Sequence, residues 1–243
     1  MKTVLITGCS SGFGLETARY FLDRDWKVIA TMRTPREDLF PRSERLRVLA
    51  LDVTDPRSIH QAVAAAGPID VLVNNAGIGL LGALEGTPME SVRDIFETNT
   101  FGTIAMTQAL LPQFRQRQAG TIVNVTSSVT LKSLTLLSVY TASKAAINAF
   151  TESLALELQP FNIRVSLVLP GRAPETRFGE NAQGRILIPE AYADLAKSVF
   201  AQWAESSEVT LARDVAEAVW RAANDPAAPV RIVAGADALA LVG

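Results

Sequence analysis

The chain has 243 residues, with 23 lysines and arginines against 25 aspartates and glutamates, so its formal net charge is −2 at neutral pH. This near-neutral balance argues against nucleic acid as the main partner, and no apolar run approaches the roughly 20 residues that a membrane-spanning helix needs. The only cysteine is Cys9 and the only histidine is His60, which excludes an intrachain disulfide and argues against a metal site built on these residue types.

Short runs rich in leucine and β-branched residues alternate with longer amphipathic segments along the chain. The expected strands are 3–7, 27–32, 47–51, 71–74, 121–126, 164–169 and 230–233. The expected helices are 13–24, 57–66, 89–118, 139–159, 189–205 and 213–224. Most of the strand segments are apolar throughout, as in a parallel sheet that helices cover on both faces. The pattern predicts a single α/β domain over 1–243 with a doubly wound parallel sheet (a Rossmann fold), which binds ligands at the carboxyl ends of its strands.

The apolar stretch before the first glycine is only Val4, Leu5 and Ile6, which is too short for a signal peptide. We therefore expect a cytoplasmic protein.

A glycine-rich loop follows the first strand, with the sequence Gly8-Cys9-Ser10-Ser11-Gly12-Phe13-Gly14. Glycines let backbone N–H groups approach a pyrophosphate, and the positive end of the following helix attracts its charge. The spacing G-x-x-x-G-x-G differs from the common G-x-G-x-x-G fingerprint. The loop predicts dinucleotide binding, with a purely structural strand-to-helix turn as the alternative.

The next two strand ends indicate which dinucleotide binds. The second strand ends without the carboxylate that NAD-binding proteins usually place there, and Arg33 follows it instead. Because an arginine can pair with a 2′-phosphate, we predict NADP(H) as the cofactor, with a merely solvated arginine as the alternative. Asp52 and Val53 follow the third strand and are expected to flank the adenine, although Asp52 is equally suited to cap the helix that begins near Pro56.

Polar residues also mark the fourth strand end and the long helix after it. Asn74-Asn75-Ala76-Gly77 suits a tight turn whose side chains brace neighbouring backbone, and Asn75, Ala76 and Gly77 belong to the expected cofactor site. Asn99 lies inside the expected helix 89–118, where a polar side chain bends a helix by competing for its backbone hydrogen bonds. At that bend Asn99 can hold a water that connects Lys144 to solvent.

The candidate catalytic residues are Tyr140 and Lys144, which are four residues apart and share one face of a helix. A free tyrosine titrates near about 10, and a nearby ammonium lowers that pKa by favouring the phenolate. The pair therefore suits general acid–base catalysis. Any amphipathic helix can carry such a pair, but Ser127, just beyond the fifth strand, can donate to a substrate carbonyl and stabilise its oxyanion.

These segments, taken in order, resemble the short-chain dehydrogenases/reductases from Thr7 to about Val233. The resemblance rests on Thr7-Gly8-x-x-x-Gly12-x-Gly14, Asn74-Asn75-Ala76-Gly77, Asn99, Ser127, Tyr140-x-x-x-Lys144 and Pro170-Gly171. It implies that Tyr140 is the acid/base, that Lys144 lowers its pKa and holds the nicotinamide ribose, and that Ser127 orients the carbonyl. It further implies that Asn99 anchors a proton-relay water and that Pro170, Gly171 and Thr176 surround the nicotinamide.

Within that family, the chain looks most like the 17β-hydroxysteroid and retinol dehydrogenase group, which mostly prefers NADP(H). This likeness rests on segments 7–12, 30–33 and 79–82 and suggests a bulky hydrophobic alcohol or ketone as substrate. Two segments depart from the family's pattern. The loop 171–176 carries Arg172 and Glu175, and the segment between Ser127 and Tyr140 has Lys132 but no glycine or proline.

The expected substrate pocket is apolar, as ligand pockets mostly are. Its predicted residues are Leu80, Leu81, Val129, Leu134, Leu137 and Phe178, with 177–205 as a segment that covers the substrate; core or subunit-interface packing is the alternative for each of them. The long helices 89–118 and 139–159 pair between subunits in this family, and the apolar tail 238–242 suits a buried contact. We therefore predict a homodimer or homotetramer.

The sequence thus predicts an NADP(H)-dependent oxidoreductase that interconverts a carbonyl and a secondary alcohol on a hydrophobic substrate. A second hypothesis is a 3-oxoacyl thioester reductase, for which basic residues near the entrance would attract an acidic carrier: Lys132, Arg172, Arg177 and Arg185. A third is a non-catalytic, cofactor-sensing binding protein, although such proteins usually lose the tyrosine or the lysine.

Overall fold

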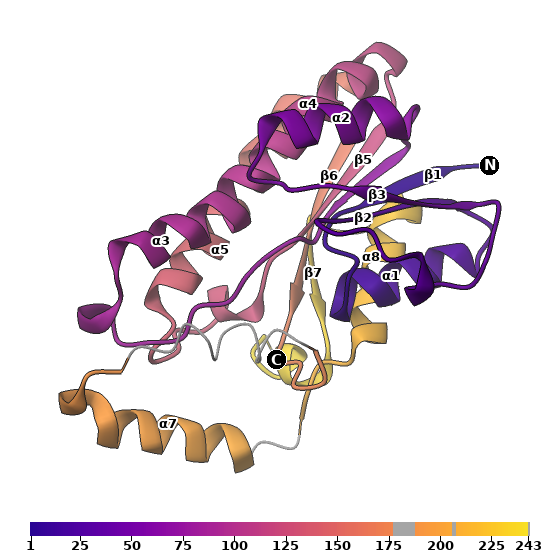
Figure 1. Ribbon diagram of the computed structural model, residues 1–243. Coiled ribbons are helices and arrows are strands. Elements are labelled where there is room, and N and C mark those ends of the chain that lie inside the picture. The colour runs from indigo at the N-terminus through magenta and orange to yellow at the C-terminus, as the bar shows by residue number, and fades with distance from the viewer. Residues whose placement is uncertain (177–187, 206–207, 243) are drawn as a thin grey trace.

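The computed structural model describes residues 1–176, 188–205 and 208–242, and seven strands of this part form one parallel sheet (Figure 1). In chain order the strands are β1 (Thr3–Ile6), β2 (Lys27–Met32), β3 (Leu46–Ala50), β4 (Val71–Asn74), β5 (Gly120–Val125), β6 (Ile163–Pro170) and β7 (Arg231–Ala234). Their order across the sheet is β3-β2-β1-β4-β5-β6-β7. This arrangement confirms the predicted doubly wound α/β fold, and every strand end lies within one residue of its prediction.

The helices also follow the prediction, with three differences. They are α1 (Gly12–Leu22), α2 (Pro56–Ala66), α3 (Met89–Phe96), α4 (Gly102–Arg117), α5 (Ser138–Leu158), α7 (Ala193–Glu205), α8 (Ala212–Asn224) and α9 (Ala236–Leu239). The helix expected over 189–205 begins only at Ala193, after a 3-10 turn at Glu190–Tyr192. The expected continuous helix 89–118 is interrupted by a π-helical turn, Glu97–Phe101, between α3 and α4. The four-residue α9 was not predicted, because it is too short to show a helical period.

The helices form a layer on each face of the sheet (Figure 1). Helices α1 and α8 pack on one face, where Phe21 and Val219 meet strand residues such as Val4. Helices α2, α4 and α5 pack on the other face, where Phe114 belongs to the same cluster as Leu5, the strand neighbour of Val4. Because successive strand residues point to opposite faces, a strand that is apolar throughout contributes to both clusters.

The strand order creates the ligand-binding edge. From β1 the chain moves outward to β2 and β3 and then returns to the other side of β1 to form β4. The connections after β1 and β4 therefore diverge at their carboxyl ends, where sheets of this type bind ligands. Among the described residues, no helix combines the length and the apolar character needed to cross a membrane.

Candidate active site

The glycine-rich loop after β1 is packed too tightly for side chains. Gly8 has a φ of +73°, and a Cβ atom there would lie 2.8 Å from the Cα of Ala76. A Cβ atom at Gly14, in the first turn of α1, would collide with the carbonyl oxygen of Gly8. The glycines thus bring the backbone of the first turn of α1 against the end of β4.

Thr7 and Asn75 hold this loop in place. The Thr7 hydroxyl oxygen accepts the backbone N–H groups of Asn75 and Ala76, both at 2.9 Å. The Asn75 side-chain amide donates to the carbonyl oxygens of Thr7 at 2.9 Å and Gly8 at 3.2 Å. The bracing role expected for this asparagine motif is therefore confirmed, and it ties the ends of β1 and β4 together.

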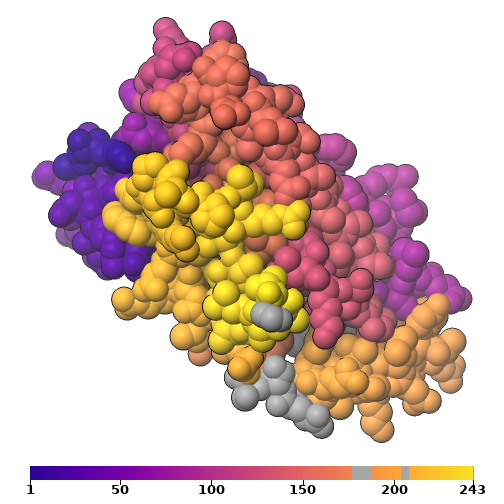
Figure 2. Space-filling model, turned by 180° about the vertical axis from the view of Figure 1, so that it is seen from behind, coloured from indigo at the N-terminus to yellow at the C-terminus, as the bar shows by residue number. Residues whose placement is uncertain are grey.

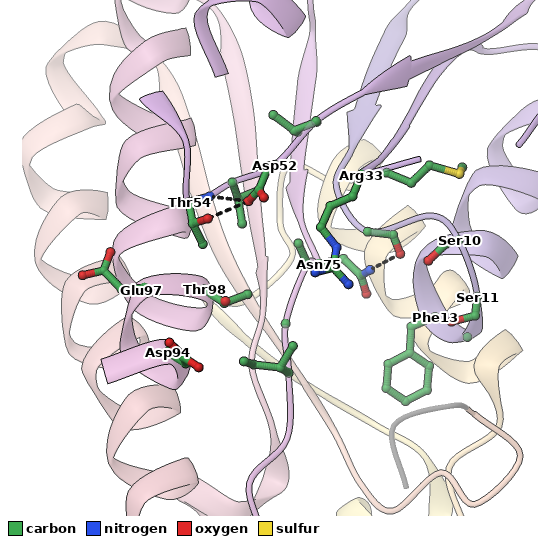
Figure 3. A pocket seen from close by; sticks show the side chains of 18 of the residues that line it. Ser10, Ser11, Phe13, Arg33, Asp52, Thr54, Asn75, Asp94, Glu97 and Thr98 are labelled. Atoms are coloured by element: carbon green, nitrogen blue, oxygen red, sulfur yellow. Dashed lines mark hydrogen bonds between the residues drawn. The ribbon is translucent and has the colours of Figure 1, made fainter. Parts of the chain in front are cut away.

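A pocket of about 730 Å³ opens above the loop (Figure 3). Most of the residues predicted to bind the cofactor line it: Gly8, Ser10, Ser11, Gly12, Phe13, Arg33, Asp52, Val53, Asn75, Ala76, Gly77 and Thr176. Sequence reasoning missed other lining residues: Met32, Leu51, Thr54, Ile78, Asp94, Glu97 and Thr98. The first four of these directly follow or precede predicted residues in the sequence. The last three come from the helical segment around Asn99, and helical periodicity did not show which side of that segment faces the pocket.

Charges of opposite sign line opposite sides of this pocket. Figure 3 shows Arg33 and Ser10 on one side and Asp94 and Glu97 on the other. Partial burial raises the pKa of Asp52, but hydrogen bonds from Thr54 and the charge of Arg33 outweigh this effect, so the pKa lies below its ordinary value. Arg33 therefore provides a positive charge that an anionic ligand group can use.

Asp52 does not cap α2, so the alternative role considered for it is wrong. Its Oδ1 atom accepts the backbone N–H of Thr54 at 2.9 Å and the Thr54 hydroxyl at 2.7 Å. The N-cap of α2 is Asp55, which accepts the backbone N–H of Arg57 at 2.9 Å. Asp55 lies directly before the first helical residue, which is the position from which a side chain reaches the free N–H groups of the first turn.

Tyr140, Lys144 and Ser127 meet at the end of β5. Tyr140 and Lys144 are each only 6% exposed, and Lys144 Nζ lies 6.0 Å from the centre of the Tyr140 ring, so they share one face of α5 as predicted. The Tyr140 and Ser127 side chains are hydrogen-bonded to each other. Lys144 Nζ donates to the carbonyl oxygen of Val125 at 3.2 Å.

Burial shifts the titration of both groups. It raises the pKa of the Tyr140 phenol above its ordinary value, while the hydrogen bond with Ser127 lowers it. Burial also lowers the pKa of Lys144 to about 8, which leaves the side chain mostly protonated at neutral pH. The hydrogen bond with Ser127 lowers the pKa of Tyr140, while the Lys144 ammonium donates to the carbonyl oxygen of Val125.

Asn99 links the pocket to the helix that carries Tyr140. Its Oδ1 accepts the Ile78 N–H at 2.8 Å, and its Nδ2 donates to the Ile78 carbonyl oxygen at 2.9 Å and to Ser143 Oγ at 3.2 Å. The Ser143 hydroxyl donates to the carbonyl oxygen of Tyr140 at 2.7 Å. The irregularity expected at Asn99 is present as the π-helical turn, which is common at functional sites.

Ser127 is held by a short network that the sequence did not reveal. Its Oγ accepts the Val129 N–H at 3.3 Å, and its carbonyl oxygen accepts the Thr130 hydroxyl at 2.9 Å. Thr130 Oγ1 in turn accepts a hydrogen bond of 2.8 Å from the side chain of Asn148. Asn148 follows Lys144 by four residues, and this spacing is the signal that could have placed it on the catalytic face of α5.

The predicted substrate residues separate into three groups. Leu80, Val129 and Leu137 pack in one cluster with Tyr140, and Leu81 packs in a neighbouring cluster with residues of α7. Leu134 is 36% exposed. Phe178, Arg177 and Arg185 lie outside the described residues, as does the first part of the predicted covering segment 177–205, of which 188–205 is described.

Five residues of the predicted cofactor set are not among those that line the pocket: Gly14, Tyr140, Lys144, Pro170 and Gly171. A Cβ atom at Gly77 would lie 3.4 Å from Lys144 Nζ, so this lysine adjoins the pocket wall. Gly14 packs beneath the loop, and a Cβ atom at Gly171 would collide with the Asp237 carboxylate. Pro170 ends β6 next to Gly171. These glycines contribute close packing rather than a pocket surface.

Comparison with known sequences gives a family model and relatives that all point to the same family. A family model described as short chain dehydrogenase matches residues 2–184, which is more than half of the chain. An uncharacterized oxidoreductase of Bacillus subtilis is 44% identical over 70% of this chain and 64% of the relative. Human retinol dehydrogenase 8 is 42% identical over 70% and 58%, and human 17-beta-hydroxysteroid dehydrogenase type 1 is 39% identical over 74% and 59%. The chain therefore matches less than two thirds of the length of these relatives.

Solved structures give the same result over almost the whole chain. A short-chain dehydrogenase from Streptomyces avermitilis superposes with a TM-score of 0.83 at 34% identity, covering 99% of this chain and 90% of its own. A serine dehydrogenase complexed with NADP+ has a TM-score of 0.83 at 27% identity, with coverage of 97% and 95%. A short-chain dehydrogenase from Burkholderia phymatum, in complex with NAD, has a TM-score of 0.81 at 25% identity, with coverage of 96% and 88%.

Proposed function

The chain belongs to the short-chain dehydrogenase family, and from this premise we propose that it is an NADP(H)-dependent oxidoreductase that interconverts a carbonyl and a secondary alcohol. The observation that carries the proposal is the hydrogen bond between Tyr140 and Ser127, with Lys144 on the same face of the helix. This group adjoins, through Gly77, the wall of a pocket that the glycine-rich loop lines. A proton-transferring group beside a dinucleotide-sized pocket suits hydride-transfer chemistry.

The pocket fits a dinucleotide. Its volume of about 730 Å³ lies within the range of cofactor sites, and the backbone of the glycine-rich loop lines it, held by close packing at Gly8 and Gly14. The loop and the start of α1 would hold the pyrophosphate through backbone N–H groups, and Asp52 with Val53 would flank the adenine. Arg33 supports NADP(H) over NAD(H), because its guanidinium suits a 2′-phosphate.

The nicotinamide supplies or accepts the hydride, and the protein handles the proton at the substrate oxygen. In reduction, Ser127 donates a hydrogen bond to the carbonyl oxygen and stabilises the negative charge that develops there. Tyr140 gives its phenolic proton to the same oxygen, and the Lys144 ammonium stabilises the phenolate that remains. In oxidation the phenolate of Tyr140 takes the hydroxyl proton of the substrate. Because burial disfavours this phenolate, Ser127 and Lys144 are needed to stabilise it.

The substrate side of Tyr140 favours an apolar molecule. Leu80, Val129 and Leu137 belong to one apolar cluster with Tyr140, and we propose that this cluster provides the apolar contact for a small-to-medium hydrophobic alcohol or ketone. Human retinol dehydrogenase 8, which is named for a hydrophobic alcohol, is 42% identical in the matched region. We therefore propose hydrophobic carbonyl compounds and secondary alcohols as the substrate class.

A turnover screen of the purified protein tests this function. Ketones, aldehydes, quinones and acyl thioesters are offered with NADPH and, in parallel, with NADH. We expect consumption of NADPH with hydrophobic ketones. Activity with acetoacetyl thioesters alone would instead favour the 3-oxoacyl thioester reductase, and NADPH binding without turnover across the panel would favour a cofactor-sensing protein.

Arg33→Ala tests the cofactor assignment. Loss of the arginine is expected to weaken NADPH binding by about 10- to 100-fold, the size of one or two charge-assisted hydrogen bonds, and to leave NADH binding nearly unchanged. Arg36→Ala is the matched control, because Arg36 is paired with Asp38 on the surface. A tenfold preference of the unmodified protein for NADH would contradict the assignment.

A further inference from the structure

The short helix α9 near the C-terminus carries a carboxylate that reaches the loop after β6. Asp237 Oδ2 accepts the backbone N–H of Arg172 at 2.6 Å, and Asp237 Oδ1 accepts the Thr210 hydroxyl at 2.6 Å. In the view from behind, the C-terminal segment (yellow in Figure 2) lies near the middle of the visible face of the molecule. Asp237 thus joins the C-terminal segment to the loop that follows β6.

Thr210 completes the attachment from the segment before α8. It is 1% exposed, and its Oγ1 accepts the backbone N–H of Gly171 at 2.9 Å. Its own N–H donates to the carbonyl oxygen of Arg172 at 2.8 Å. The backbone of Gly171 and Arg172 is therefore held by three hydrogen bonds from Thr210 and Asp237.

The packing at these contacts leaves no room for other side chains. A Cβ atom at Gly171 would collide with the Asp237 carboxylate, and one at Gly235 would collide with the Thr210 hydroxyl. Gly235 also has a φ of +98°, which side chains rarely adopt. The two glycines thus let the carboxylate and the hydroxyl approach the backbone directly.

The held backbone leads into the pocket. Thr176 closes the loop 171–176 by donating its N–H and its hydroxyl to the carbonyl oxygen of Ala173, at 3.1 and 2.8 Å. Thr176 lines the pocket, and a Cβ atom at Gly12 would lie 3.2 Å from its Cβ. Because β6 pairs with β5, whose end leads to Ser127, the loop starts beside the strand that carries this serine, and its last residue, Thr176, reaches the glycine-rich loop at Gly12.

We propose that Asp237 is a positioning residue for the cofactor: it fixes the loop 171–176 in the conformation that contacts the nicotinamide half of the dinucleotide. The proposal rests on the proposed function. Hydrogen bonds to a carboxylate are stronger than neutral ones, and a loop held before binding loses less conformational entropy when the ligand arrives. Asp237, with Thr210, lies beyond the segment 2–184 that the family model matches.

The test compares two ligands with three variants: Asp237→Asn, Asp237→Ala and the control Asp225→Ala. The ligands are NADPH and its nicotinamide-free fragment, 2′-phospho-ADP-ribose. Asp225 is a suitable control because its carboxylate also accepts a backbone N–H, that of Ala227 at 2.9 Å, in the turn between α8 and β7. Binding is measured by titration calorimetry, and folding by the thermal midpoint.

We expect Asp237→Ala to raise the Kd of NADPH about tenfold and Asp237→Asn, which keeps one acceptor oxygen, about threefold. The Kd of the fragment and the binding properties of Asp225→Ala are expected to stay within twofold of the unmodified protein. A residue with a merely structural role would lower the thermal midpoint without separating the two ligands.

Three results would overturn the proposal. If both ligands weaken equally, Asp237 does not act on the nicotinamide half. If the unmodified protein binds both ligands and the Asp237 variants bind as it does, this inference fails and the proposed function stands. If the unmodified protein binds neither ligand, both proposals fail.

Discussion

Two opposing effects act on the phenol of Tyr140. Burial of a side chain that is 6% exposed raises its pKa, and the hydrogen bond with Ser127 lowers it. Each pH unit of such a change corresponds to about 1.4 kcal/mol in the balance between phenol and phenolate. Ser127 therefore has two expected roles, one on the substrate oxygen and one on the pKa of the acid/base.

Ser127→Ala is expected to remove both effects. The kcat value should fall by about 100-fold, as when one oxyanion donor is lost. The pH at which alcohol oxidation begins should move upward, because the pKa of Tyr140 rises when the hydrogen bond is lost. Ser128→Ala is the matched control, since both serines are 7% exposed. An unchanged pH profile in a folded Ser127→Ala protein would show that Ser127 does not tune the phenol.

The buried charge of Lys144 is expected to lower the free energy of unfolding at neutral pH. Burial lowers its pKa from 10.5 to about 8, which corresponds to a cost of ~3 kcal/mol for holding the charge in the folded state at neutral pH. The cost is fully present below pH 8 and is relieved as the pH rises from about 8 toward 10.5, because the unfolded chain then holds more protons.

Lys144→Met is therefore expected to abolish turnover and to raise the free energy of unfolding at pH 7 by about 1–3 kcal/mol. The unmodified protein, unlike this variant, should gain stability between pH 8 and 10. Urea unfolding at several pH values measures both effects, with the exposed Lys132→Met as control. A lower stability of Lys144→Met at pH 7 would contradict the account.

Ser127, Tyr140 and Lys144 could be predicted from the sequence because the serine follows a strand and the other two share a helix face. Both signals are local. The sequence did not indicate Asn148 and Thr130, which support Ser127 through contacts between α5 and the turn after β5. It also assigned the tuning of Tyr140 to Lys144 alone. The direction of the Lys144 side chain, toward the Val125 carbonyl oxygen, depends on the packing of α5 on β5.

At the scale of elements, Arg164 on β6 fixes the C-terminal end of α8. Its guanidinium donates to the carbonyl oxygens of Ala222, Ala223 and Asp225, each at 2.9 Å. These are carbonyl groups of the kind that a helix end leaves without an intrahelical partner. The arginine therefore joins the sheet to the helix that leads into β7.

Arg164→Met is expected to lower the free energy of unfolding by about 2–4 kcal/mol, because several hydrogen bonds to a charged group are lost. Arg231→Met is the control: Arg231 makes an exposed ion pair with Glu152, and such pairs contribute about 0–1 kcal/mol. Urea unfolding monitored by circular dichroism gives both values, and equal effects of the two substitutions would refute the capping role.

The elements were predictable to the extent that they are periodic. All seven strands followed from apolar runs, because both faces of a parallel sheet are covered. The π-helical turn did not follow from periodicity, because the pattern of apolar residues passes through Glu97–Phe101 unchanged; only the polar Asn99 inside the helix indicated an irregularity there. Asn99 bonds to Ile78, which precedes it by 21 residues. Contacts between distant segments leave no mark on helical periodicity.

For the whole molecule, several large apolar side chains are exposed on or near the segments that are predicted to pair between subunits. Phe101 is 53% exposed between α3 and α4, and Leu156 on α5 is 73% exposed. Near the C-terminus, Leu239 and Val242 are 54% and 55% exposed. Large apolar side chains left at a surface are typical of interfaces when they gather on one face.

We propose that the protein forms a homodimer or homotetramer through the helical stretch 89–118 and α5, and light scattering at micromolar concentration tests this. Leu156→Arg is expected to reduce the assembly to a smaller species, because it places a charge in the contact. Leu84→Arg, at a residue 63% exposed and outside these helices, is the control. A monomeric unmodified protein would contradict the prediction.

How far apart the residues of the site lie along the chain decided which of them could be predicted from the sequence. The lining residues that come just after β1, β2 and β3, such as Gly8, Arg33 and Asp52, were predictable from their positions at the strand ends. The part near β6 depends on Thr210 and Asp237, which are distant in sequence from Gly171. Only the folded chain brings these residues together.

The proposed chemistry depends most on Tyr140 as the group that exchanges a proton with the substrate oxygen. Tyr140→Phe keeps the ring and its apolar contacts and removes only the hydroxyl. We expect turnover of a hydrophobic ketone with NADPH to fall by at least about 1,000-fold, with the Kd of NADPH within about threefold of the unmodified protein. Turnover by Tyr140→Phe at the rate of the unmodified protein would contradict the account.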